Sequence, residues 1–119
     1  MGDIWETNNQ KTTLKEMILS EAILNCKNYI DTEEIIHSIF AKRNNGKFLP
    51  DSEALVLELT PEEMEMQLSI IAETKCPGFE YFLEIFVLQD FYDDLLKIEE
   101  FKSDDKKVER IIYYAEFDA

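Results

Sequence analysis

Adjacent pairs of acidic residues are the feature of this sequence whose residue type and spacing best fit a catalytic or metal-binding site. Two carboxylates held side by side can act as a hydrolase acid and base, or ligate a divalent cation. On a helix, however, adjacent residues point about a quarter-turn apart, and acids gather at helix starts because they interact favourably with the helix dipole. We therefore interpret the pairs as solvated surface rather than as a catalytic site. They are Glu62/Glu63, Asp93/Asp94, Glu99/Glu100 and Asp104/Asp105.

Other reactive side chains are too few to complete a familiar catalytic set. The chain has one histidine, His37, and two cysteines, Cys26 and Cys76, which lie far apart in the sequence. A zinc tetrad needs four ligands, and a small secreted scaffold carries more cysteines. Glycine-rich phosphate loops, nucleophile elbows and EF-hand loops are missing from the sequence. We therefore expect no catalytic, cofactor-binding or metal-ligating residues, a protein that is not an enzyme, and reduced thiols in the cytoplasm.

The net charge is strongly negative and unevenly distributed. Twelve Lys and Arg against 26 Asp and Glu give −14, of which residues 51–119 carry −13. A field of this sign repels nucleic-acid phosphates and anionic lipid, and it attracts basic protein surfaces. Acids also interrupt every long apolar run, so no segment can span a bilayer. We expect a basic protein partner, no direct nucleic-acid binding and no membrane association. Solubility alone would also explain such a charge.

A helix over residues 79–97 is the expected centre of the fold. Tyr81, Ile85, Leu88 and Leu95 fall on one stripe at helical spacing, and aromatic and aliphatic residues widen that stripe in the first half. A helix that is apolar almost all round is buried. The second half, from residue 89 on, gains acidic residues. This element is therefore expected to begin in the core and to end at the surface.

Helix-start signals recur along the rest of the chain, at Thr13–Glu16, Asp31–Glu34, Thr60–Glu63 and Ser103. We therefore predict an all-α fold, a compact bundle of about six short helices around the central helix, in one domain over residues 1–119 with residues 1–11 as a candidate flexible arm. The helix that begins at Asp31 would turn Ile35, Ile36, Ile39 and Phe40 inward. An α+β fold with short strands near 54–59 and 110–117 is the alternative, because both stretches also have strand character.

Acids and aromatics near the exposed end of the central helix are the candidate partner-binding residues. Asp90, Asp93, Asp94, Glu99 and Glu100 would form an acidic ring, and Phe91, Tyr113 and Tyr114 would supply its anchors. A role in the core is the competing interpretation for each of these aromatics.

The stretches 79–95 and 110–117 resemble immunity proteins of bacterial contact-dependent growth inhibition systems. The shared pattern is an aromatic-rich acidic helix followed by a tyrosine-rich terminus. The resemblance implies a small cytosolic protein that neutralises a toxin domain delivered from a neighbouring cell, in a one-to-one complex. Many such toxins are nucleases, including EndoU-like ribonucleases. Members of this group share no common functional residues, so the resemblance assigns none here.

The leading hypothesis is thus a non-enzymatic immunity protein, monomeric when free, that covers the cationic groove of a nuclease toxin with its carboxylates. Two alternatives remain open. One is a nucleic-acid mimic that inhibits a defence nuclease. The other is a small carboxylate- or metal-dependent hydrolase.

Overall fold

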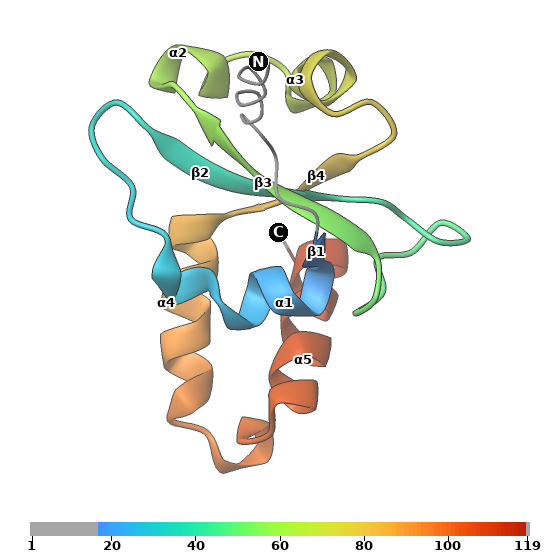
Figure 1. The fold of residues 1–119 in the computed structure, drawn as a ribbon. Helices are drawn as coiled ribbons and strands as arrows, with labels where there is room; N and C mark the ends of the chain where they lie inside the picture. Colours follow the sequence, from blue (N-terminus) through green and yellow to red (C-terminus); the bar gives the residue numbers. More distant parts are fainter. Residues whose placement is uncertain (1–16, 119) are drawn as a thin grey trace, which may run out of the picture.

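The protein folds as an α+β domain with helices on both faces of an antiparallel sheet (Figure 1). The computed structural model describes residues 17–118. The strands are β1 (Met17–Ile18), β2 (Ile36–Ala41), β3 (Glu53–Leu59) and β4 (Glu80–Glu84). The helices are α1 (Leu19–Leu24), α2 (Pro61–Met64), α3 (Leu68–Lys75), α4 (Ile85–Leu96) and α5 (Asp104–Phe117), with short 3-10 helices η3 (Cys26–Asn28) and η4 (Glu99–Phe101).

The sheet has the strand order β1-β3-β2-β4, and β2 with β3 forms its central ladder. Ile36 lies opposite Leu59 at one end of that ladder, and Ala41 lies opposite Ala54 at the other. The tight turn beyond this second end places Asn45 and Gly46 at φ angles of 54° and 81°. Both residue types tolerate positive φ, so the Asn-Gly pair suits this turn between β2 and β3.

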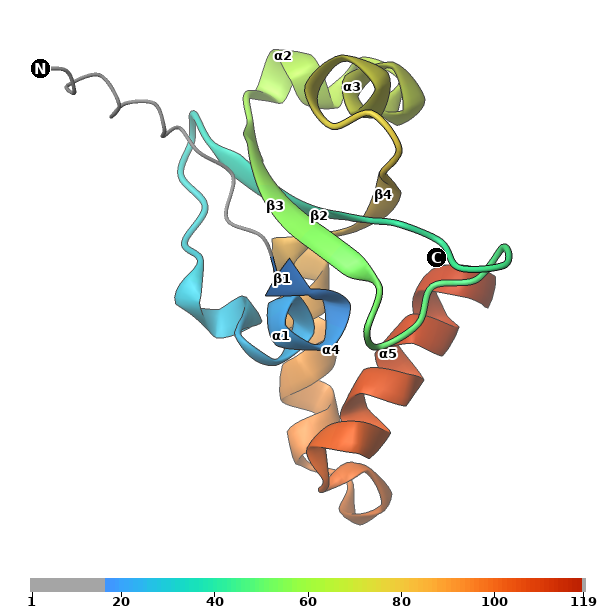
Figure 2. The same ribbon diagram turned by 45° about the vertical axis from the view of Figure 1, so that its right-hand side comes forward.

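Two helical layers bury the sheet from opposite sides (Figure 2). Helices α1, α4 and α5 cover one face and form the larger core with alternate residues of the strands, such as Ile39 and Ala41. Helices α2 and α3 cover the other face, where Ile71 and Ala72 pack on Phe40 and Leu57. Because both faces are buried, the strands carry apolar residues on both sides.

The predicted all-α bundle is wrong for this reason. Residues 36–41, expected within a helix, form β2, and residues 80–84, expected as the first turns of the central helix, form β4. A strand buried on both faces lacks the polar and apolar alternation that identifies a half-exposed strand, so its apolar run also fits a buried helix. The central helix is therefore shorter than predicted and begins at Ile85.

The α+β alternative has the right class but only one of its two strands. Residues 54–59 lie in β3, whereas residues 110–117 lie in α5, as the preferred helix assignment predicted. The Ser103 hydroxyl accepts the Lys106 N–H at 3.2 Å and caps α5. At the start of α2, Thr60 and Glu63 exchange backbone-to-side-chain hydrogen bonds of 3.2 and 2.9 Å. Both predicted helix starts are therefore confirmed.

Two predictions for the N-terminus, the arm at residues 1–11 and the capping box at Thr13–Glu16, lie outside the described residues. From Met17 the chain forms β1 and then α1, which ends at Leu24. Among residues 17–118, no helix combines the length and the apolar character that crossing a membrane requires.

Candidate functional site

The hairpin of α4, η4 and α5 carries the acids that the sequence predicts for partner binding. Asp90, Asp94 and Glu100 are exposed. Asp93 is half-buried and accepts a hydrogen bond of 2.5 Å from the Lys27 ammonium. Glu99 lies 3.6 Å from the Lys102 ammonium. The hairpin therefore brings these acids to one end of the molecule (Figure 1), but two of them have basic partners within the chain.

The predicted aromatic anchors divide into packed and exposed side chains. Phe91 and Tyr114 are half-buried, and their rings meet edge-on with centroids 4.8 Å apart, between α4 and α5. The Arg110 guanidinium lies 5.2 Å from the Phe91 ring. Tyr113 is 54% exposed and faces outward. Phe91 and Tyr114 thus join the two helices of the hairpin, and Tyr113 is the anchor candidate that solvent reaches.

The charge of the hairpin is modest once its bases are counted. Residues 90–110 contain eight acids and five bases, a net charge of −3. One of the bases, Lys107, is buried, and its ammonium donates to the Lys102 carbonyl at 2.6 Å. Lysines interleaved with the acids therefore weaken the field that a basic partner would meet here.

A second group of acids, at the opposite end of the molecule, has almost no such compensation. Residues 31–37 and 58–65 contain seven acids and no lysine or arginine. Within the described residues, one base from outside these segments forms an ion pair with the group, Lys75 at 3.0 Å from Glu63. We call this group the strand-end acidic face, and its members are Asp31, Glu33, Glu34, Glu58, Glu62, Glu63 and Glu65.

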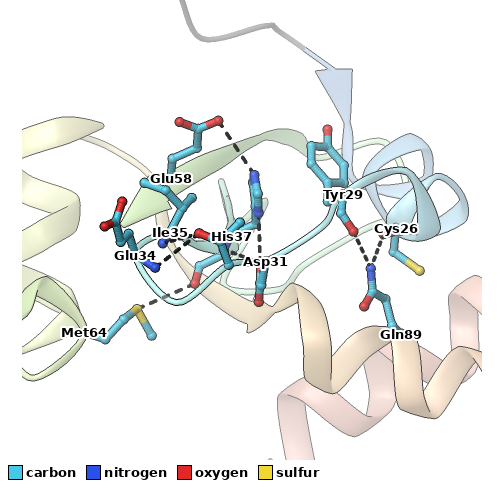
Figure 3. Close-up of polar contacts among 11 residues, drawn as sticks. Cys26, Tyr29, Asp31, Glu34, Ile35, His37, Glu58, Met64 and Gln89 are labelled. Carbon is cyan, nitrogen blue, oxygen red and sulfur yellow. Dashed lines mark hydrogen bonds and ion pairs between the residues drawn. The ribbon is translucent and has the colours of Figure 1, made fainter. Parts of the chain in front are cut away.

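The β2–β3 pairing brings the two acidic segments together. His37 lies opposite Glu58, one step from the end of the ladder. The loop that enters β2 and the helix that leaves β3 therefore start from neighbouring points on the sheet. The Ser38 hydroxyl lies 3.9 Å from the Met64 sulfur, so α2 lies against the start of β2 (Figure 3). Acids far apart in sequence thus share one edge of the fold.

The loop before β2 is ordered by its own side chains. The Thr32 hydroxyl accepts the backbone N–H groups of Glu34 and Ile35 at 3.1 and 3.0 Å, and the Thr32 N–H donates to the Ile35 carbonyl at 2.9 Å. Here Asp31–Glu34 forms a turn into a strand, which corrects the predicted helix start. Capping-box residue types also suit such turns, because their hydroxyls and carboxylates bond to nearby amides in either setting.

His37 lies beneath this face with a carboxylate near each ring nitrogen (Figure 3). Asp31 accepts both the backbone N–H of His37 at 2.9 Å and a hydrogen bond from Nδ1 at 2.8 Å. Nε2 lies 3.7 Å from the Glu58 carboxylate. The Tyr29 ring packs on the imidazole at 5.3 Å. The contacts between His37 and Asp31 therefore join the loop to β2. The Asp31 charge also acts on Glu84, the last residue of β4: burial, with a smaller contribution from that charge, raises the pKa of Glu84 above its usual value.

Gln89 of α4 fixes the other end of the same loop. Its side-chain amide donates to the carbonyls of Cys26 and Tyr29, both at 2.8 Å (Figure 3). Gln89 was assigned no role in the sequence-based predictions, because an amide in an acidic helix gives no signal for a contact with residues some 60 positions away. The contacts of Gln89 and His37 together hold residues 26–37 against α4 and the sheet.

The described side chains of this face do not form a familiar catalytic set. His37 and Asp31 have the geometry of an oriented base, but a second carboxylate, that of Glu58, stands opposite Nε2 where a nucleophile would be needed. Burial raises the pKa of the Cys26 thiol to about 11 and also raises that of Cys76, so neither is a ready thiolate. Among residues 17–118 no three His, Cys, Asp or Glu side chains are grouped to hold a metal ion.

Comparison with protein-family models finds no match for this chain, and comparisons with curated proteins and with solved structures find none either. The interpretation of the strand-end acidic face therefore depends on its own charge and geometry.

Proposed function

We propose that this protein is a non-enzymatic inhibitor that binds a basic protein domain through the strand-end acidic face. The observation that carries the proposal is that the β2–β3 pairing joins, at one end of the ladder, two segments that together contain seven acids and no lysine or arginine. Uncompensated charge on one face speeds the encounter with an oppositely charged surface and selects the partner by charge. The partner class that fits best is a nuclease toxin domain, since a nuclease needs a cationic groove to hold its substrate.

Order within the face favours binding. The Thr32 turn, the His37–Asp31 contact and the Gln89 contact fix the loop before the partner arrives. A preordered surface loses less conformational entropy on association than a mobile one. The face therefore combines high charge with a fixed shape, the combination that a tight inhibitor of a cationic groove needs.

A matched pair of charge-reversal variants tests the proposal. The face variant replaces Glu34, Glu62 and Glu65 with lysine, and the hairpin variant replaces Asp90, Asp94 and Glu100. All six side chains are exposed, and each variant changes the net charge from −14 to −8. With a basic nuclease domain that the original chain inhibits, found by screening a panel of such nucleases, as the probe, we expect the face variant to lose at least about 100-fold in inhibition. The hairpin variant should lose less than about threefold.

Because both variants change the net charge equally, comparing them distinguishes the position of the acids from the total charge of the protein. Equal losses in both variants would show that only net charge matters, and a greater loss in the hairpin variant would move the binding site to the hairpin. A probe panel of unrelated basic nucleases distinguishes a mimic of nucleic acid, which would inhibit several of them, from a cognate inhibitor, which would stop one.

A further inference from the structure

Two neighbouring aromatic side chains on α5 form the most exposed aromatic surface among the described residues. Tyr113 and Phe117 are 54% and 71% exposed, and their ring centroids lie 4.8 Å apart at an angle of 47°. They are four positions apart in the sequence, so they lie one above the other on the same side of the helix. Aromatic pairs of this kind are common anchors of protein interfaces. We call this pair the aromatic ridge.

A hollow lies on each side of the aromatic ridge. The first has a volume of about 480 Å³ and lies between α5 and the β2–β3 turn, with Gly46, Lys47, Phe48 and Ile112 among its walls. The second has a volume of about 370 Å³ and is lined by Phe101, Lys106 and Arg110. A ridge flanked by hollows is the shape that two copies of one surface need for mutual insertion.

The wall of the first hollow is fixed in place. The Glu116 carboxylate accepts the Phe48 N–H at 2.9 Å and an Arg43 guanidinium N–H at 2.8 Å. These bonds outweigh the opposing effect of burial and hold the pKa of Glu116 below its usual value. The turn thus stays joined to α5, and the hollow keeps its shape when it is empty.

Charge identifies the occupant of this surface. Around the ridge, three bases (Lys47, Lys106 and Arg110) face four acids (Glu100, Glu109, Glu116 and Asp118), so this surface is nearly neutral, whereas the whole chain carries −14. A basic partner gains little from a neutral surface. A second copy of this chain would meet strong repulsion over its acidic surfaces, but on this neutral one it would find both signs of charge to pair with.

We propose that two copies of this chain associate through the aromatic ridge about a two-fold axis. Each ridge enters the hollow beside the β2–β3 turn of the other copy, and Lys47 and Lys106 of one copy face Glu109 of the other. The strand-end acidic face lies at the opposite end of the β2–β3 ladder and stays open in the dimer. This inference does not depend on the function of that face.

Salt gives self-association a signature opposite to that of partner binding. Raising NaCl from about 0.1 to about 1 M shortens the Debye length from roughly 10 to roughly 3 Å and screens the repulsion between the two acidic copies. Dimerisation should therefore strengthen with salt, whereas binding of a basic partner should weaken.

Sedimentation-velocity measurements on the full chain over a wide concentration range test the dimer. We expect the weight-average sedimentation coefficient to rise with concentration, and to rise earlier at high salt. The double variant Tyr113→Ser, Phe117→Ser should raise the dimer dissociation constant at least about tenfold. Ile30→Ser, at a side chain that is 78% exposed and distant in sequence, is the matched control and should leave it unchanged.

Dilution of the unmodified chain, followed by backbone NMR, supplies a second readout that needs no variant. Changes in backbone chemical shift on dilution should be largest in residues 46–48 and 106–117. A constant monomer mass at every concentration and salt, an unchanged dimer in the double variant, shift changes elsewhere, or a dimer that weakens with salt would each overturn the proposal.

Discussion

The two ends of this molecule hold similar numbers of carboxylates in different ways. The strand-end acidic face has seven acids in segments without lysine or arginine, and the hairpin has eight acids among five bases. The first set surrounds a hydrogen-bonded loop, whereas several acids of the second extend into solvent. Because counter-charges decide the field that a partner meets, we expect a basic partner to prefer the strand-end acidic face to the hairpin.

Among the variants that test this contrast, the largest loss of stability is expected at Gln89, which fixes the loop of the strand-end acidic face. Gln89→Ala removes two hydrogen bonds and leaves the Cys26 and Tyr29 carbonyls unpaired. We expect the free energy of unfolding to fall by about 2–3 kcal/mol in urea titrations. Gln67→Ala, at an exposed residue whose side chain does not cap α3, should cost less than about 0.5 kcal/mol. Similar losses in both variants would show that the loop is not held by this contact.

A smaller, pH-dependent effect on stability is expected at Glu63, which belongs to the strand-end acidic face and to the capping box of α2. The Thr60 N–H, followed by Lys75, lowers the pKa of Glu63. A lowered folded-state pKa contributes stability that is present above the unfolded value, about 4.3, and is lost as pH falls through the folded value. Glu63→Gln should therefore destabilise the protein at pH 7 by about 0.5–1 kcal/mol, and the difference should shrink below pH 4.

Thermal unfolding across this pH range, with Glu65→Gln as the exposed control, checks that prediction. A difference between Glu63→Gln and the original protein that stays constant from pH 7 to pH 3 would contradict the assigned role of the carboxylate.

The smallest effect is expected in the hairpin. Lys27→Gln breaks the ion pair with Asp93, in which both side chains are about half exposed. Exposed ion pairs contribute little to stability and are screened by salt. The loss on urea unfolding should be small at low salt and disappear at high salt. A loss larger than that of Gln89→Ala would reverse the contrast drawn between the two ends.

Local signals in the sequence predicted the helix starts but not the sheet. The capping box at Thr60 and the cap at Ser103 depend on residues three apart, and both form as predicted. The strand β2 failed because its pattern depends on what covers each face. Ile39 packs on one helical layer and Phe40 on the other. The sequence of β2 alone does not show that two layers exist.

The strand-end acidic face was not predicted, for a related reason. Acids at residues 31–34 and 58–65 lie about 25 positions apart, and only the antiparallel register of β2 and β3 unites them. The sequence shows the excess of acidic residues over 51–119, but it does not show where they lie in the fold, and the predicted binding residues were placed near the end of the aromatic helix. What sequence reasoning lacked was the pairing of Ile36 with Leu59, a long-range contact that no local pattern specifies.

The direct junction between β4 and α4 has a consequence for the fidelity of folding. Glu84 is both the last residue of the edge strand and the N-cap of the helix, with no loop between them. A two-residue slip of β4, which would preserve its inward and outward faces, would move the start of α4 by about 7 Å. The buried Ile85 and Leu88 would then leave the larger core. Packing of α4 against the core thus favours one register of the edge strand. Edge strands are otherwise the part of a sheet most prone to pair with another chain.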